Sequence, residues 1–198
     1  MTAPASGFDA NATARGRAPQ TERLLLRPFE PDDFDALYSY QSRDDVTRHL
    51  YWGARSPAEV REALRKKLAS TAIRAPGDVL ALAMVLRSTG ELVGDYVLDW
   101  KPDEHRQGEI GYIVHPDHQG HGYATEAGGV LLSIAFDDVG LHRVIGRIEP
   151  RNAASARVLE KLGMRREAHL VENEFVRGEW QSEIIYAMLD REWRARRA

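Results

Sequence analysis

The stretch HPDHQGHGYATEA, residues 115–127, decides the fold, because a strand-like run precedes it and a helical pattern follows it. Gly120 and Gly122 lie two residues apart and permit a tight turn whose successive N–H groups point into one concavity. The positive end of the following helix makes this turn suited to an anion such as a pyrophosphate. No Lys followed by Ser or Thr is present here, which excludes a nucleotide-hydrolysing P-loop, and the third glycine of a dinucleotide fingerprint is missing. A plain strand-to-helix connection is the alternative interpretation.

Outward from this stretch, strand and helix signals are mixed along the chain. Strands are predicted over Leu24–Leu26, Val79–Arg87, Leu92–Trp100, Gln107–His115, His142–Glu149, Glu167–Phe175 and Ser182–Leu189. Helices are predicted from Pro31 and over Ser56–Ser70, Gly122–Asp138 and Asn152–Leu162. Hairpins alternate with β-α-β connections, so the fold class is α/β (mixed α+β) around one sheet. We expect a disordered leader over residues 1–20, one domain over residues 21–190 and a solvated basic tail over residues 191–198.

Composition narrows the classes of function. The 198 residues carry 27 Lys and Arg against 30 Asp and Glu, a net charge of −3 that gives no overall attraction to nucleic acid. Cysteine is absent, which excludes disulfides, thiolate nucleophiles and a covalent acyl-thioester enzyme. No apolar run is long enough to span a membrane, and residues 1–20 contain no apolar core of a signal peptide, so we expect a cytoplasmic protein without membrane contact. His115, His118 and His121 recur every third residue, but they fall in the anion-binding turn and we expect no metal.

Three motifs, in order along the chain, resemble the GCN5-related N-acetyltransferase (GNAT) family. QGHGYA, residues 119–124, is similar to the family motif Gln/Arg-x-x-Gly-x-Gly/Ala, and residues 120–127 resemble the branch that acetylates the N-termini of ribosomal proteins (the RimJ/RimL-like branch). The helix NAASARVLEKLGM, residues 152–164, resembles that branch with Met164 in place of the usual aromatic residue. TERLLLRP, residues 21–28, is typical of its first strand. The resemblance extends over residues 21–189.

The resemblance implies a mostly antiparallel mixed sheet of about seven strands, flanked by about four helices. Its strands Gln107–His115 and His142–Glu149 would splay apart, and the pantetheine arm of acetyl-CoA would pair there like an extra strand. The backbone of Gly120–Ala124 would hold the pyrophosphate, and Asn152 would bond the pantetheine or phosphate side, besides capping its helix. The implied set of residues that bind acetyl-CoA is Ile113, Val114, His115, Gln119, Gly120, His121, Gly122, Tyr123, Ala124, Thr125, Asn152 and Ser155.

Acyl transfer to an amine needs one group that takes the proton of the ammonium and one that serves the departing thiolate. Many relatives carry a Tyr seven residues after the Asn of the second motif, but Leu159 stands at that position. Ser155 lies on the same helical face and is proposed for this role in the resembled branch; a small packing residue is the alternative. Glu109, near the splay, is the candidate base, acting directly or through water; a salt bridge at the strand edge is the alternative.

The sequence therefore predicts an acetyl-CoA-dependent N-acetyltransferase that works by direct transfer in a ternary complex. The expected acceptor is the N-terminal α-amino group of a protein or peptide. A small amine such as an antibiotic, polyamine or amino acid is the second candidate, and a non-catalytic acyl-CoA-binding regulatory module is the third. Tyr51, Trp52 and Trp100 are candidates for an acceptor pocket, with core packing as the alternative. Relatives are often dimers, so a homodimer is possible on the resemblance alone.

Overall fold

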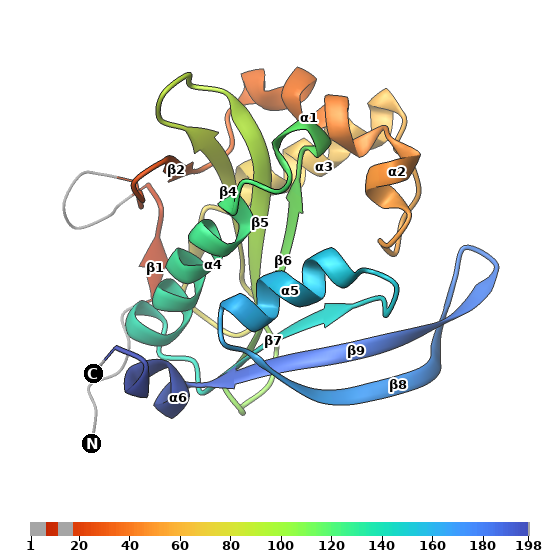
Figure 1. The fold of residues 1–198 in the computed structure, drawn as a ribbon. Coiled ribbons are helices and arrows are strands. Elements are labelled where there is room, and N and C mark those ends of the chain that lie inside the picture. Colours follow the sequence, from red (N-terminus) through yellow and green to blue (C-terminus); the bar gives the residue numbers. More distant parts are fainter. Residues whose placement is uncertain (1–6, 12–17, 198) are drawn as a thin grey trace.

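The computed structural model describes residues 7–11 and 18–197, and its central element is a seven-stranded sheet with helices on both faces (Figure 1). The strand order is β2-β4-β5-β6-β7-β9-β8, and every neighbouring pair is antiparallel except β6 and β7. The strands are β2 (Leu24–Arg27), β4 (Val79–Leu86), β5 (Leu92–Trp100), β6 (Gln107–Val114), β7 (Arg143–Ile148), β8 (Arg165–Val176) and β9 (Glu179–Leu189). The predicted strands are confirmed, with the last two longer than expected.

Six α-helices lie within the described ranges, where about four were expected. They are α1 (Phe34–Gln41), α2 (Asp44–Thr47), α3 (Pro57–Ala69), α4 (Tyr123–Ser133), α5 (Ala153–Lys161) and α6 (Asp190–Ala195). The predicted capping box at the start of α3 is present: Ser56 accepts from the backbone of Glu59, and Glu59 accepts from the backbone of Ser56. Over the residues described, none of these helices combines the length and apolarity that a membrane span needs.

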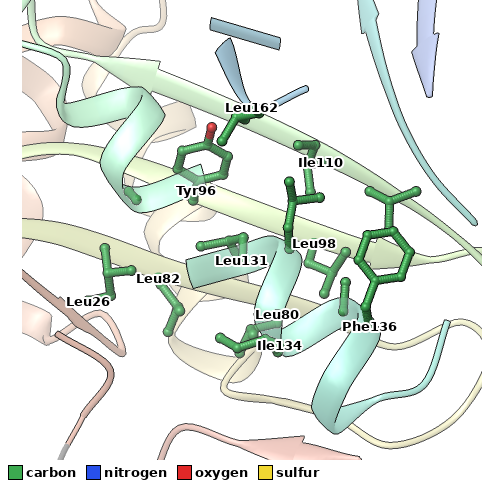
Figure 2. Close-up of a cluster of buried hydrophobic side chains, with 14 of the residues drawn as sticks. Leu26, Leu80, Leu82, Tyr96, Leu98, Ile110, Leu131, Ile134, Phe136 and Leu162 are labelled. Atoms are coloured by element: carbon green, nitrogen blue, oxygen red, sulfur yellow. The ribbon is translucent and has the colours of Figure 1, made fainter. Parts of the chain in front are cut away.

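Two hydrophobic cores lie on opposite faces of the sheet. On β4, Leu80 and Leu82 point into the core beneath α4, which Figure 2 shows, while Ala81 and Ala83 point toward α1 and α3. Alternate residues of a strand face opposite sides, so a strand covered on both faces is apolar throughout, as β4 is. Because both faces of the sheet are packed against helices, the positions of its strands are fixed.

The sheet opens between its two central strands. β6 and β7 pair in parallel only from Gln107↔Arg143 to Glu109↔Ile145, although β6 continues to Val114 and β7 to Ile148. Residues 110–114 of β6 therefore keep one edge without a strand partner. The splay predicted from the family resemblance is present in the structure.

The two ends of the chain differ from the sequence prediction. Within the expected disordered leader, Phe8–Asp9 forms β1, which pairs with β3 (Ala72–Ile73); residues 1–6 and 12–17 of that leader lie outside the described residues. The basic tail is mostly exposed, as expected, but it begins as part of α6, where the Trp193 ring stacks on Phe136 at 6.0 Å between centroids. A short amphipathic segment gains order from a distant partner, which the local pattern alone does not reveal.

Two adjacent glycines of α4 give a test of this packing. A methyl group at Gly128 would lie 2.7 Å from both Leu162 Cδ1 and the buried Tyr96 hydroxyl, whereas one at Gly129 meets nothing within 4 Å. We expect Gly128→Ala to lower the free energy of unfolding by about 1–3 kcal/mol through overpacking. Gly129→Ala, the matched control, should raise it by about 0.5–1 kcal/mol because alanine favours the helix. Denaturant unfolding measures both, and equal effects of the two substitutions would contradict the packing described.

Candidate active site

A groove of about 620 Å³ lies where the first turn of α4 faces α5 across the splay. It brings together most of the residues predicted to bind acetyl-CoA. These are Ile113, Val114, Gln119, Gly120, Gly122, Tyr123, Ala124, Thr125, Asn152 and Ser155. Segments far apart in sequence, among them the motifs at residues 119–124 and 152–164, thus converge on one surface.

The glycine turn presents a run of free backbone donors. Gly120 and Gly122 have φ of +80° and +83°, values that favour glycine, and Gly122 is the residue before α4. Within the described structure, no backbone N–H from Gly120 to Thr125 donates a hydrogen bond; the first that does is Glu126 N, to Gly122 O at 3.0 Å. Such a run at a helix N-terminus is a site for a phosphate group.

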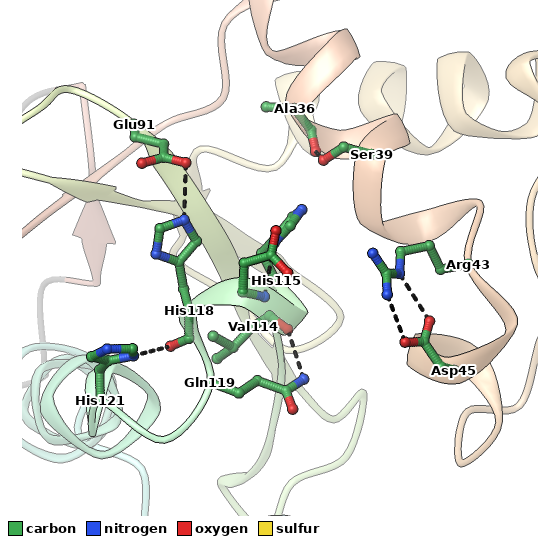
Figure 3. A network of polar contacts seen from close by, with 11 residues as sticks. Ala36, Ser39, Arg43, Asp45, Glu91, Val114, His115, His118, Gln119 and His121 are labelled. Atoms are coloured by element: carbon green, nitrogen blue, oxygen red, sulfur yellow. Dashed lines mark hydrogen bonds and ion pairs between the residues drawn. The ribbon is translucent and has the colours of Figure 1, made fainter.

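Side chains around the turn hold its shape. Gln119 Nε2 donates to Val114 O at 3.1 Å, and His121 Nδ1 lies 3.3 Å from His118 O (Figure 3). His118 Nε2 in turn contacts Glu91 Oε1 at 2.9 Å. His115 and His121 do not line the groove, so the structure does not bring these two predicted residues into it.

Four cations line the groove, none of which the sequence analysis assigned to acetyl-CoA. They are Arg48, Arg151, Arg157 and Lys161, and Arg151 also contacts Glu149 at 2.7 Å. Asp45 is the one acidic residue among the described residues of the lining, and it pairs with Arg43. The groove is therefore electropositive, which suits a ligand with several phosphates. Arg157 and Lys161 are four residues apart on α5, and this helical spacing could have predicted that the two cations share one face of the helix.

A three-residue cluster anchors the start of α4. Glu126 accepts from the Arg23 backbone N–H at 3.0 Å, from Arg23 Nε at 2.7 Å and from the Thr21 hydroxyl. Burial acts to raise the pKa of Glu126, but these hydrogen bonds and the nearby guanidinium lower it below its usual range overall. The carboxylate thus ties the strand motif at residues 21–28 to the glycine turn.

A second cavity, of about 430 Å³, lies on the side of the sheet that α3 covers. Tyr51 and Trp52 line it as expected, whereas Trp100 does not. Six residues line both this cavity and the groove: His49, Leu50, Tyr112, Ile113, Asn152 and Ser155. The two spaces therefore meet at the splay.

Ser155 stands at this junction with a partner that the sequence did not reveal. Its Oγ lies 2.6 Å from the Tyr112 hydroxyl, and its backbone N–H donates to Asn152 Oδ1 at 3.0 Å. Burial raises the pKa of Tyr112 to about 12, although the hydrogen bond with Ser155 acts to lower it. Tyr112 thus keeps its proton near neutral pH. Strand alternation places it opposite the face of Glu109, but only the tertiary packing of α5 brings it to Ser155.

Glu109 lies at the base of the splay and lines the second cavity. Its Oε1 contacts Arg147 Nε at 3.0 Å, and its Oε2 lies 2.8 Å from Lys101 Nζ. The Arg147 guanidinium also lies within 3.6 Å of Glu174 and Glu183, so these carboxylates share one cation. The candidate base is thus present in the cavity, with cations at both of its oxygens.

A histidine and a carboxylate at the junction form a further pair. His49 Nδ1 contacts Glu149 Oε2 at 2.7 Å, and the acceptor-only carboxylate requires the hydrogen on Nδ1. Burial acts to raise the pKa of Glu149, but hydrogen bonds from Arg151 and His49 lower it overall. This tautomer leaves Nε2 of His49 able to accept a proton. No local sequence signal marks His49, since its partner is 100 residues away.

Comparison with known proteins gives the family. The family described as Acetyltransferase (GNAT) domain matches residues 23–165. The chain belongs to the GNAT acetyltransferases. It is 34% identical to YnaD of Bacillus subtilis, an uncharacterized N-acetyltransferase, over 87% of this chain and 97% of YnaD. This acetyltransferase therefore uses acetyl-CoA to acetylate an amine, as the sequence predicts.

Solved structures agree with the fold. A GNAT acetyltransferase from Bacillus anthracis superposes with a TM-score of 0.79 at 32% identity, covering 87% of this chain and 98% of that one. The spermidine N-acetyltransferase of Vibrio cholerae, solved with CoA and spermine, gives 0.74 at 22% identity, covering 87% and 99%. YdaF of Bacillus subtilis, which is provisionally named as a ribosomal N-acetyltransferase, is 26% identical over 87% of this chain and 94% of YdaF.

The Glu126 cluster makes a pH-dependent contribution to stability. Its pKa is lowered on folding, so the stabilisation is present above the unfolded pKa and disappears as pH falls through the folded one. We expect Glu126→Gln to lower Tm by about 2–4 °C at pH 7, the effect of about 1 kcal/mol in a chain of this size. The difference should close toward pH 3 in thermal unfolding. Glu22→Gln, at a residue that makes no ion pair with another described residue, is the matched control; a gap that persists at pH 3 would contradict the role of the charge.

Proposed function

We propose that this acetyltransferase transfers the acetyl group directly from acetyl-CoA to the N-terminal α-amino group of a protein or peptide. The observation that carries the proposal is the junction at the splay, where Ser155 and Tyr112 line both the groove and the second cavity. A donor in the groove and an amine in the cavity would meet there. The groove is then the acyl-CoA site and the cavity the acceptor site.

The chain supplies complementary groups to each part of acetyl-CoA. The free N–H groups from Gly120 to Thr125 suit the pyrophosphate, and Arg157 and Lys161 add positive charge for further phosphate. The unpaired edge of β6 at Ile113 and Val114 offers backbone groups to the amide-containing pantetheine arm. His115 and His121 would contribute through the conformation of the turn, since neither lines the groove.

The proton balance assigns the two catalytic roles. The bound ammonium loses one proton to a base, the amine attacks the thioester carbonyl, and collapse of the tetrahedral intermediate breaks the C–S bond and forms the amide. The electron pair leaves on sulfur, which takes a proton from a donor, and the second proton that nitrogen loses restores that donor. We assign Ser155 as the donor to sulfur, oriented by Tyr112, and Glu109 as the base, directly or through water.

The motifs and the surface near the cavity support a polypeptide acceptor. The branch resemblance and the similarity to YdaF point to N-terminal acetylation of proteins. Phe175 and Trp180, each 62% exposed, form an aromatic pair near the tip of the β8–β9 hairpin (Figure 1), a surface suited to residues beyond the first. A small amine is the second candidate, since the chain shares its fold with the spermidine N-acetyltransferase of Vibrio cholerae.

Two further expectations remain part of this proposal. We place the enzyme in the cytoplasm, where acetyl-CoA and newly made protein N-termini are both present. The homodimer expected from relatives stays a prediction that solution scattering would test.

One experiment tests the proposed acceptor. Calorimetric titration with acetyl-CoA should show binding, and thiol release in the same sample should then follow addition of a peptide that begins with Ser or Ala. Release with small amines only would move the assignment to the second candidate. Absence of acetyl-CoA binding would overturn the assignment of the groove.

Ser155 gives a direct test of the acid. Ser155→Ala should lower kcat by about 100-fold, the lower end of what a positioned proton donor contributes, while the Kd for acetyl-CoA changes less than about 3-fold. Tyr112→Phe should lower kcat by about 10-fold, and the double variant should resemble Ser155→Ala because Tyr112 acts through Ser155. Ser133→Ala, at a serine of α4 that bonds Asp137, is the control. Unchanged kcat in Ser155→Ala would remove this residue from the mechanism.

The base is tested by the pH dependence of kcat/KM. A base must be deprotonated to act, so wild-type kcat/KM falls toward acidic pH. Glu109→Gln should lower kcat/KM by about 100-fold and remove this acidic limb. Glu174→Gln, another carboxylate beside Arg147, should keep the limb.

His49→Gln completes the comparison, because His49 is the second proton acceptor at the junction. If His49→Gln removes the limb and Glu109→Gln keeps it, the proton passes to the His49–Glu149 pair. That result would contradict the assignment of Glu109.

A further inference from the structure

Most of the charges that line the acceptor cavity divide between its two sides. Among the described residues, four of its five carboxylates come from β6 to β9 and the residue after β7: Glu109, Glu149, Glu174 and Glu183. The fifth, Asp95 of β5, pairs with Lys67. Three Lys and Arg residues come from α3 and the segment before it, Arg55, Lys66 and Lys67, whereas Arg147 of β7 lies among the glutamates. The carboxylates are thus concentrated on the side formed by β6 to β9, and most of the cations lie on the α3 side.

Each carboxylate of the cavity already has a cation or a hydroxyl beside it. Asp95, buried on β5, accepts from Lys67 Nζ at 2.6 Å and from the Tyr40 hydroxyl at 2.6 Å. Glu183 accepts from the Tyr51 hydroxyl and from Asn173 Nδ2 at 2.7 Å. The other three contact Arg147, Lys101, Arg151 or His49. A polyamine would therefore have to displace an existing partner at every acidic residue.

Arg55 differs from the other cations that line the cavity because it has no carboxylate partner among the described residues. In the described parts of the chain, no carboxylate oxygen lies within 4.0 Å of its guanidinium. The guanidinium lies 3.7 Å from the centre of the Trp52 ring, and its Nη1 donates to Gln41 Oε1 at 2.7 Å. Burial lowers the pKa of Arg55 from its usual value, while the nearby charges of Asp95 and Glu59 act to raise it. A half-buried cation whose hydrogen-bond partner is neutral can bind an anionic group of a ligand.

The surrounding structure holds this guanidinium in place. The Arg55 backbone N–H donates to Gln41 O at 2.9 Å, and the next residue, Ser56, is the N-cap of α3. Gln41 is itself 1% exposed, so its side chain is a fixed support. Trp52 covers one face of the planar Arg55 guanidinium. The guanidinium N–H groups that do not bond Gln41 are available for the bidentate contact that carboxylates make.

We propose that Arg55, supported by Trp52 and Gln41, binds a carboxylate carried by the acceptor, so that the acceptor is an amine and a carboxylate at once. The inference rests on the proposed function and specifies its substrate class. The amine lies toward Ser155 and the glutamates, and the carboxylate lies toward α3. A free amino acid and a peptide with an acidic side chain near its N-terminus both carry this chemistry. A polyamine does not, because its second cation would meet Arg55.

Matched acceptors test the proposal by activity. Peptides with Asp at the second, third or fourth position are compared with their Asn counterparts, and free amino acids with their amides. We expect kcat/KM to be at least about 10-fold higher for the carboxylate member of one series, and that series identifies the source of the carboxylate. Arg55→Gln should reduce this ratio to within about 2-fold, and Arg55→Lys should restore part of it.

Arg61→Gln is the matched control, since Arg61 also lies over an aromatic ring, Phe34 at 4.9 Å, but outside the cavity. It should keep the wild-type ratio. A ratio near one for the wild-type enzyme in every series, or spermidine as the preferred acceptor, would overturn the proposal. A ratio that survives in Arg55→Gln would overturn the role of Arg55.

Binding gives a readout that does not depend on turnover. With CoA present, calorimetry should show the carboxylate member of the pair binding at least about 10-fold more tightly than its amide, and Arg55→Gln should abolish the difference. Equal binding of both members overturns the carboxylate site while leaving N-acetylation intact. Carboxylate-selective binding without transfer to any amine would instead contradict the proposed function and keep the site.

Discussion

The short pairing between β6 and β7 is the constraint on which the rest of the site depends. Three residues of each strand pair in parallel, and beyond Glu109 and Ile145 the strands diverge. Adjacent strands normally satisfy each other's backbone groups, so a divergence inside a sheet leaves polar edges to be paired by something else. The separation also joins the groove on one side of the sheet to the cavity on the other. Acetyl-CoA in the groove and the amine in the cavity would therefore approach each other through a gap in the sheet.

Helix α5 takes the position that the divergence leaves. Gly146 of β7 has no side chain, and a Cβ there would lie 3.0 Å from the Leu159 side chain, so glycine allows α5 to pack closely. Leu159, 1% exposed, stands at the position where the family resemblance implies a tyrosine in many members. In this chain the hydroxyl pair of Ser155 and Tyr112 stands at the junction instead. In the proposed mechanism a tyrosine from the strand orients the serine that the helix supplies.

Much of the fold was predictable because its elements carry local signals. Apolar runs of strand length marked β4 and β5, alternation marked β6, the Ser56–Glu59 pair marked the start of α3, and the glycine turn marked the start of α4. β1 and α6 were missed, since each depends on a partner far away in the sequence. Within the site, the motifs located the groove but not its cations or the partners of Glu109. Side chains from separate strands and helices meet only after the chain has folded, and no spacing rule connects Tyr112 with Ser155 or His49 with Glu149.

Hydrogen exchange of the backbone amides of β6 tests the central claim most directly, because the claim is that the splayed edge is where acetyl-CoA binds. With saturating acetyl-CoA, the amides of residues 110–114 and those of the turn at residues 120–125 should exchange more slowly, while the amides of β2 stay unchanged. Tight binding of acetyl-CoA without added protection at β6 and the turn would contradict the account and place the donor elsewhere on the molecule.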